Sequence, residues 1–109
     1  MKKTTYLNPL DEHLETVVNR TWNAAGRCKT WDDHVHNAVE GLAAEAGEVL
    51  DVHKKLFWHK SKDRTAEIKE EIGDVCFYLA KLLELHGLSL EECLANNKVK
   101  LFERYGVQE

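Results

Sequence analysis

Hydrophobic side chains recur along the chain every three to four residues, the spacing that places them on one face of an α-helix. Strand-like alternation of β-branched residues is absent. The pattern predicts four helices, at about residues 9–26, 34–58, 65–86 and 90–105. The charged segment 59–64 is predicted to be a loop. Because the connections among the last three helices are short, we expect them to pack antiparallel in an all-α four-helix bundle.

Local signals at the ends of these segments support the four helices. Asn8 is a suitable N-cap for the first helix, with Pro9 in its first turn, and Gly26 is expected to end it. Gly87 follows the third helix, where glycine is the usual residue. The segment Ser89-Leu-Glu-Glu92 is a capping box that opens the fourth helix.

The composition narrows the class of protein. A chain of 109 residues allows a single domain, residues 1–109, and its small size favours completion of the bundle by oligomerisation. The formal charge of −4 disfavours binding to a DNA or RNA polymer. No apolar run approaches a membrane span, and the N-terminus does not resemble a signal peptide. Three widely spaced cysteines favour a reducing compartment, so we expect a cytoplasmic protein.

Acidic residues interrupt the apolar faces of the second and third predicted helices. At about 100° per residue, these faces hold Val39, Leu42, Ala43, Ala46, Val49, Leu50, Val52 and Leu56, and then Ile68, Ile72, Val75, Tyr78, Leu79, Leu82 and Leu83. Glu45 falls inside the first face and Glu48 just beyond its edge. Glu71 falls inside the second face, with Asp74 at its edge. Each helix therefore carries one acid within its packing face and another three residues later at the rim.

The two acidic pairs predict a metal site. Burying an ionised carboxylate without a partner is very costly. Four acids that converge between two helices also repel one another, which raises their pKa values unless a cation lies among them. Mg²⁺ and Mn²⁺ prefer oxygen ligands. Either pair alone is weak evidence, since acids three residues apart are common on exposed helices, but two matched pairs within apolar faces indicate one shared site.

The fourth predicted helix carries complementary chemistry on one face. Asn97, Lys100 and Arg104 lie on the same face as its leucines. Two cations and an amide on one face suit a phosphate chain or a nucleotide. The alternative is that the two cations form ordinary salt bridges with acids of the third helix. Beside the acidic pairs, an anionic substrate that carries its own metal explains both signs of charge.

Three segments resemble a known family: GLAAEAGEVLDVHKK (residues 41–55), EIKEEIGDVCFYLAKL (67–82) and NKVKLFERY (97–105). They are similar to the MazG-type nucleoside triphosphate pyrophosphohydrolases of the all-α NTP pyrophosphatase superfamily. The hallmark of that superfamily is Glu-x-x-Glu followed, after a spacer, by Glu-x-x-Asp, and 22 residues separate the two motifs here. The resemblance covers roughly residues 36–105, and three blocks in the right order are more specific than one motif.

The resemblance implies an activity and a catalytic metal site. Such enzymes use Mg²⁺, for which Mn²⁺ can substitute, and cleave a nucleoside triphosphate between its α and β phosphates to give a nucleoside monophosphate and pyrophosphate. The implied catalytic metal ligands are Glu45, Glu48, Glu71 and Asp74. An acid that is not fully used as a ligand can act as general base, and Glu48 or Glu45 suits this role.

The resemblance also implies substrate contacts and an assembly. The contacts to the nucleotide or its phosphates would come from Asn97, Lys100, Arg104 and Tyr105, with Tyr78 near the sugar or phosphates. A basic residue after the first motif, either Lys54 or Lys55, completes this set. Trp22 or Trp31 is a candidate to stack on the base. Members of the family form dimers or tetramers with sites at subunit contacts, so a homodimer or homotetramer is expected.

Three other functions compete with this one. A carboxylate-bridged di-iron or di-manganese bundle needs Glu-x-x-His motifs, and the chain has none; Asp33-x-x-His36 is the nearest. In a non-catalytic helical interaction module, the acids would simply pair with Lys and Arg across an interface. Within the superfamily, phosphoribosyl-ATP is an alternative substrate, although the pattern of the fourth helix fits the nucleoside triphosphate branch better.

Overall fold

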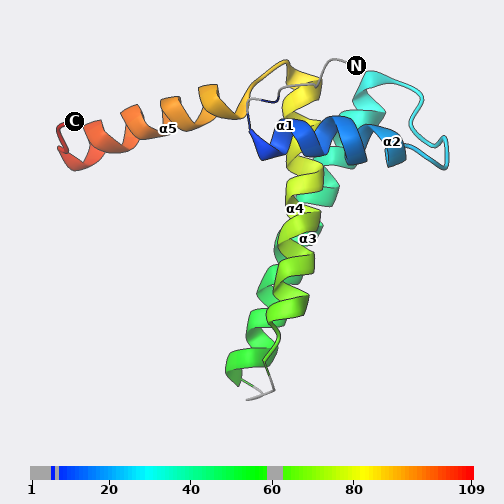
Figure 1. Ribbon diagram of the computed structural model, residues 1–109, viewed down its shortest axis with the longest axis horizontal. Coiled ribbons are helices and arrows are strands. Elements are labelled where there is room, and N and C mark those ends of the chain that lie inside the picture. Colours follow the sequence, from blue (N-terminus) through cyan, green and yellow to red (C-terminus); the bar gives the residue numbers. More distant parts are fainter. Residues whose placement is uncertain (1–5, 7, 59–62) are drawn as a thin grey trace.

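The computed structural model describes residues 6, 8–58 and 63–109, and within these ranges it contains helices and no strands. The helical segments are α1 (Pro9–His13), the π-helical turn η1 (Leu14–Val18), α2 (Asn19–Thr21), α3 (Trp31–Trp58), α4 (Thr65–His86) and α5 (Leu90–Tyr105). The segments α1, η1 and α2 follow one another without a break, so the described residues form four helices, as the sequence predicts (Figure 1). The all-α class is therefore confirmed. Most of the predicted loop 59–64 lies outside the described residues.

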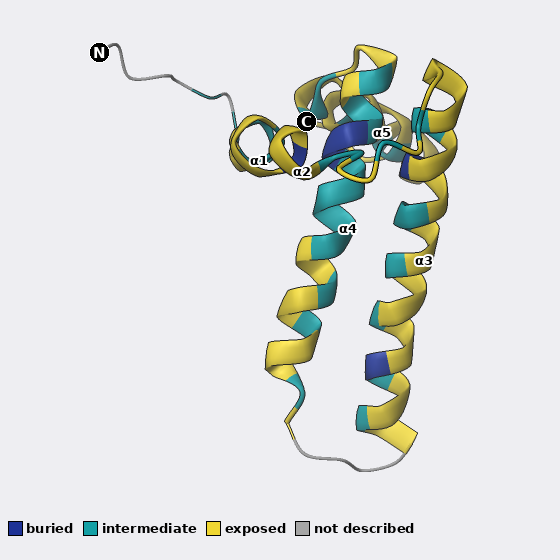
Figure 2. Ribbon diagram, turned by 90° about the vertical axis from the view of Figure 1, so that its right-hand side faces the viewer, coloured by how far each residue is buried: buried dark blue, intermediate teal, exposed yellow. Residues whose placement is uncertain are grey.

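The centre of the molecule is a hairpin of the two longest helices, α3 and α4, which run antiparallel and side by side (Figures 1 and 2). Helix α3 begins at Trp31, slightly earlier than residue 34. Thr30 and Asp33 explain this start, since the Thr30 hydroxyl accepts from the Asp33 amide (3.1 Å) and the Asp33 carboxylate accepts from the Thr30 amide (3.2 Å). Helix α4 has its predicted limits, and Gly87 follows it with a φ of 65°.

The N-terminal helix crosses α4 at the end of the hairpin where α3 begins and α4 ends (Figure 1). It begins as predicted, with the Asn8 side chain accepting from the Asp11 amide at 2.9 Å. Its predicted end at Gly26 is wrong, because the helix stops at Thr21. Asn23 takes a left-handed φ of 57° and bonds through its side chain to both the amide and the carbonyl of Cys28, which closes a loop before Gly26 is reached.

Helix α5 begins at the predicted capping box, in which Ser89 and Glu92 bond reciprocally, and it ends at Gly106. It does not pack back along α4. Instead it extends away from the hairpin as an arm (Figure 1), and among the described residues its first turn is tied to the body by the hydrogen bond from Asn8 to Glu91. The expectation that the last three helices pack side by side is therefore wrong for α5 within one chain. The left-handed turn at Gly87 redirects the chain after α4.

A single chain leaves many of its residues exposed (Figure 2). Its exposed surface is 8543 Å², whereas a compact monomer of 12.6 kDa exposes about 6,200 Å². Its radius of gyration is 17.0 Å, against about 13 Å for a compact domain of this length. The uncovered side chains include Val39, Leu50 and Ile72, which the helical pattern placed on packing faces. Among the described residues, no helix is long and apolar enough to cross a membrane.

Candidate metal centre

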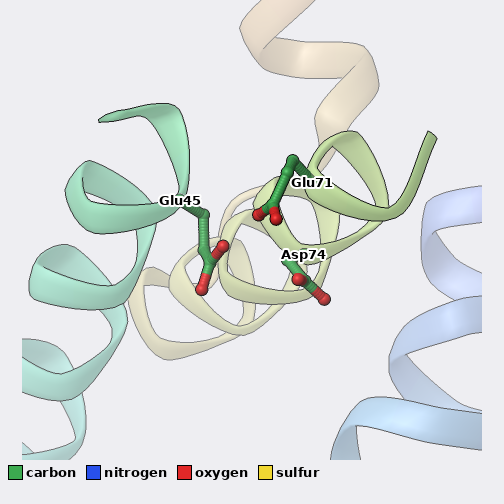
Figure 3. A group of neighbouring side chains, drawn as sticks. All are labelled: Glu45, Glu71 and Asp74. Atoms are coloured by element: carbon green, nitrogen blue, oxygen red, sulfur yellow. The ribbon is translucent and has the colours of Figure 1, made fainter. Parts of the chain in front are cut away.

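Three carboxylates converge between the two helices of the hairpin. Glu45 comes from the middle of α3, and Glu71 and Asp74 come from the first half of α4 (Figure 3). One oxygen of each lies within 4.8 Å of the other two, and all three residues are half-buried. The group contains oxygen donors alone, without a histidine or a thiol. This donor set suits a hard divalent cation.

Helical geometry brings these acids together. Glu71 and Asp74 are three residues apart, so both project from the same side of α4. Because α3 runs antiparallel to α4, its middle lies level with the first half of α4, and Glu45 faces the pair (Figure 3). Three of the four predicted acids thus converge between the two helices, as the sequence predicts.

The environment of this group favours the protonated form of Glu71. The pKa of Glu71 is raised from 4.5 to about 7. A hydrogen bond with the Glu45 carboxyl group contributes most, followed by burial and by the negative charges of Glu45, Asp74 and Glu48. Near neutral pH, a proton on Glu71 therefore reduces the negative charge of the cluster. A bound cation would reduce the same charge.

Glu48, the fourth predicted ligand, lies outside the close group. Its side chain is exposed on α3, although its charge is near enough to raise the pKa of Glu71. Three residues after Glu45, it projects from the rim of the hairpin rather than from its interior. Its carboxylate is therefore at the edge of the acidic cluster, open to water.

The predicted basic residues of α3 lie farther along the hairpin. Lys54 and Lys55 are exposed, and the Lys55 ammonium group pairs with Asp51 at 3.1 Å. Ten residues separate Lys55 from Glu45, which corresponds to about 15 Å along the helix axis. The structure does not bring either lysine to the acids.

The predicted substrate contacts of the last helix are also separated from the acids within one chain. Asn97, Lys100, Arg104 and Tyr105 are all exposed, and they lie on the arm that α5 forms away from the hairpin (Figure 1). The acids, in contrast, lie near the middle of α3 and α4. The cationic and anionic halves of the predicted site thus occupy different parts of the chain.

The predicted aromatic contacts differ in how much of each ring is already packed against other side chains. Trp22 is engaged in packing: its indole N–H donates to His34 Nδ1 at 2.9 Å, and its ring contacts Phe77 and Tyr78. The Tyr78 ring is held in the same cluster. Trp31 is 53% exposed, and its indole N–H donates to the carbonyl oxygen of Leu85 at 3.2 Å. Trp31 therefore has more free ring surface than Trp22.

Lys81 has a structural role that the sequence analysis missed. Its side chain is buried, and its ammonium group bonds to Asn19 at 2.5 Å and Glu84 at 2.7 Å and lies 5.2 Å from the centre of the Trp22 ring. Burial alone would raise the pKa of Glu84, but the hydrogen bonds from Lys81 and Asn19 outweigh it and lower that pKa. The position of Lys81 beside apolar residues of α4, three residues before an acid, was the available signal.

Comparison with known proteins identifies the family. A family model described as the MazG nucleotide pyrophosphohydrolase domain matches residues 34–106, which include both acidic pairs and the whole of α5. No curated protein and no solved structure matches the chain. Since the matched segment covers more than half of the sequence, the chain belongs to the MazG nucleotide pyrophosphohydrolase domain family.

Proposed function

We propose that this protein hydrolyses a nucleoside triphosphate, of the ribose or deoxyribose series, between its α and β phosphates in a reaction that depends on Mg²⁺. The products are a nucleoside monophosphate and pyrophosphate. The observation that carries the proposal is the convergence of Glu45, Glu71 and Asp74 from two helices. Family membership supports the reaction class.

The acidic cluster fits a divalent cation. Ligand oxygens around Mg²⁺ lie at about 2.1 Å from the ion and hence up to about 4.2 Å apart, so the spacing within 4.8 Å needs little adjustment of the side chains. The raised pKa of Glu71 supports the same assignment, because the hydrogen bond with Glu45, burial and the neighbouring negative charges all disfavour its charged form, and a cation would offset these effects. Glu45, Glu71 and Asp74 would hold Mg²⁺, with Mn²⁺ as a substitute, and Glu48, at the rim, would be the ligand that is least fully used. When bound, the ion neutralises phosphate charge and lowers the pKa of the attacking water.

Among the acids, Glu48 is best suited to accept a proton from that water. Its carboxylate is exposed at the edge of the cluster, whereas the oxygens of Glu45 are directed at Glu71 and Asp74. A general base needs a lone pair that is not committed to a cation and must reach the water directly. Glu45 is better used as a ligand.

The nucleotide contacts are proposed to come from a second copy of the chain. Asn97, Lys100, Arg104 and Tyr105 lie on an arm that does not reach the acids of its own hairpin (Figure 1). The exposed surface exceeds that of a compact monomer by about 2,300 Å², an area of the size that obligate subunit interfaces bury. In a homodimer or homotetramer, the arm of one subunit would supply its cations to the phosphates held at the acids of another.

The remaining contacts are assigned by exposure. Trp31 is the better candidate to stack on the base, since the Trp22 ring is already packed. The Tyr78 hydroxyl and either Lys54 or Lys55 complete the proposed set of substrate contacts. Trp31, Lys54 and Lys55 lie on α3 and Tyr78 lies on α4, the two helices that carry the acids.

A nucleotide panel tests the proposal. The protein is incubated with ribo- and deoxyribonucleoside triphosphates and phosphoribosyl-ATP, with Mg²⁺ or with a chelator, and the products are separated. We expect monophosphate and pyrophosphate that disappear with the chelator. Release of diphosphate and phosphate would contradict cleavage at the α–β bond, and cleavage of phosphoribosyl-ATP alone would move the substrate to that branch. No hydrolysis of any nucleotide would favour the non-catalytic interaction module.

A further inference from the structure

Among the glycines of α3 and α4, Gly41 is the one at which a side chain would collide with a neighbouring residue. A Cβ atom added at Gly41 would lie 2.5 Å from Cζ of Tyr78 and closer still to two other ring carbons. A Cβ atom added at Gly47 on α3 or at Gly73 on α4 would meet nothing within 4 Å. All three glycines lie in helix interiors, where glycine is unfavourable relative to alanine. Close approach of an aromatic ring therefore explains Gly41 but neither of the others.

The contact between Gly41 and Tyr78 lies about one helical turn from the acidic cluster. Gly41 is four residues before Glu45, and Tyr78 is four residues after Asp74. Because α3 and α4 are antiparallel, the two contacting residues are each about one helical turn, roughly 6 Å, from the acids and on the same side of them. The separation of the helices at Gly41 and Tyr78 consequently fixes their separation at the carboxylates.

The Tyr78 ring has little freedom to move away from Gly41. The Trp22 ring lies edge-on to it with 6.0 Å between centres, and the Phe77 ring lies at 5.2 Å. Trp22 is in turn held by its hydrogen bond to His34 and by the Lys81 ammonium group. A side chain at position 41 would have to displace either this aromatic cluster or the helix axis.

We propose that the contact between Gly41 and the Tyr78 ring is a positioning device that sets the gap between α3 and α4 and thereby the affinity of the acidic cluster for a divalent cation. The inference rests on the proposed function in one respect, that the cluster binds a cation. Tyr78 acts here through its ring, independently of any contact that its hydroxyl makes with substrate. Gly41 touches neither the cation nor the substrate.

Mn²⁺ titration of the full-length protein, followed by electron paramagnetic resonance, tests the role of Gly41. We expect Gly41→Ala to weaken Mn²⁺ binding at least tenfold. The matched control is Gly47→Ala, the same change on the same helix with open space for the methyl group, and it should bind Mn²⁺ within twofold of the wild type. Equal affinity of folded Gly41→Ala and wild type would overturn the proposal.

A double-mutant cycle separates positioning from general damage to the fold. Gly41→Ala adds volume to the contact and Tyr78→Leu removes volume from it, so the combined variant should bind Mn²⁺ more tightly than either single variant. Tyr78→Phe keeps the ring and should bind like the wild type. If Gly41→Ala does not fold, the Phe and Leu variants still decide: equal Mn²⁺ affinity of the two would refute a role for the ring.

A measurement without metal separates this inference from the proposed function. In the metal-free protein, the Hα protons of Gly41 should show nuclear Overhauser effects to the Tyr78 ring and an upfield shift from its ring current. If these signals are present and the wild type binds no Mn²⁺, the proposed metal site fails and the link to affinity fails with it. If Mn²⁺ binds and the signals are absent, the positioning contact alone is refuted.

Discussion

The hairpin of α3 and α4 holds the acidic cluster, whereas the arm formed by α5 holds the predicted cationic contacts, and the two regions position their side chains differently. In the hairpin, each acid is held by a helix that packs against another helix, so the carboxylates meet within one chain. The arm presents Lys100 and Arg104 on a helix that is attached mainly through its first turn. The comparison shows that packing within one chain positions the acids but not the cationic side chains of α5, which under the proposed function act in a neighbouring chain.

The largest effect on activity is expected from a substitution in the acidic cluster of the hairpin. Glu71→Gln removes a charge from the centre of the cluster and should lower kcat/KM by about 10³-fold, or about 4 kcal/mol of transition-state stabilisation. The matched control is Glu70→Gln, the same change at the preceding, exposed residue of α4, which should leave kcat/KM within about twofold. Steady-state release of pyrophosphate measures both. Similar losses in the two variants would remove the distinction between clustered and exposed acids.

A substitution in the arm should cause a smaller loss of activity, and mixing with a second variant should restore part of it. Arg104→Ala is expected to lower kcat/KM by about 10- to 100-fold, because it removes a charged contact to phosphate. When the Glu71→Gln and Arg104→Ala proteins are unfolded and refolded together, mixed dimers contain one intact pair of arm and hairpin. About a quarter of wild-type activity should therefore return. Activity equal to the average of the two parents would show that the arm serves its own hairpin.

The N-terminal helix provides a third test, on stability rather than activity. Lys81→Met removes the buried ammonium group that joins Asn19, Glu84 and Trp22, and it should lower the free energy of unfolding by about 1–3 kcal/mol. Lys69→Met on the exposed face of α4 serves as the control, with a change within about 0.5 kcal/mol. Urea denaturation measures both values. An unchanged midpoint for Lys81→Met would contradict the anchoring role of this residue.

The smallest expected effect is a pH dependence of stability that arises in the hairpin. Because the folded pKa of Glu71 is about 7 and its ordinary value is 4.5, the folded chain binds an extra proton between these pH values. Stability of the metal-free protein should therefore be highest below pH 4.5 with respect to this group, fall as pH rises to 7, and then stay level. Melting temperatures of the wild type and Glu71→Gln, compared from pH 5 to 8, isolate the contribution.

Mg²⁺ should reduce this loss of stability at higher pH. A cation competes with the proton on Glu71, so it should raise the melting temperature of the wild type more at pH 8 than at pH 5.5. Glu71→Gln should respond less at both pH values. Parallel pH curves for wild type and variant, with no dependence on Mg²⁺, would contradict the coupling between the carboxylates.

Much of the fold followed from local signals in the sequence. The limits of α4 and α5 were predicted because Gly87, Ser89 and Glu92 act on the backbone within a few residues. The end of the first helix was mispredicted because Asn23, rather than Gly26, takes the first left-handed conformation and closes the loop with its side chain. The direction of α5 was also mispredicted, since a short connection limits distance but not angle.

The candidate site was predictable to the extent that one helix face determines it. Helical spacing placed Glu45, Glu71 and Asp74 on facing sides of two helices, and these three meet. Spacing does not say which of Gly41, Gly47 and Gly73 lies under a ring, because that depends on the packing of α4 against α3. It likewise does not identify the N-terminal helix as the partner of Lys81, because the two residues of that contact are 62 positions apart in the sequence.

The arm has a consequence for when the protein becomes active. Its 16 residues extend over about 24 Å, and they carry cations that a solitary chain does not bring to its own carboxylates. If a neighbouring chain supplies them, newly made protein at low concentration hydrolyses nothing until subunits meet. Specific activity should then decline on dilution, at the concentration where the assembly dissociates.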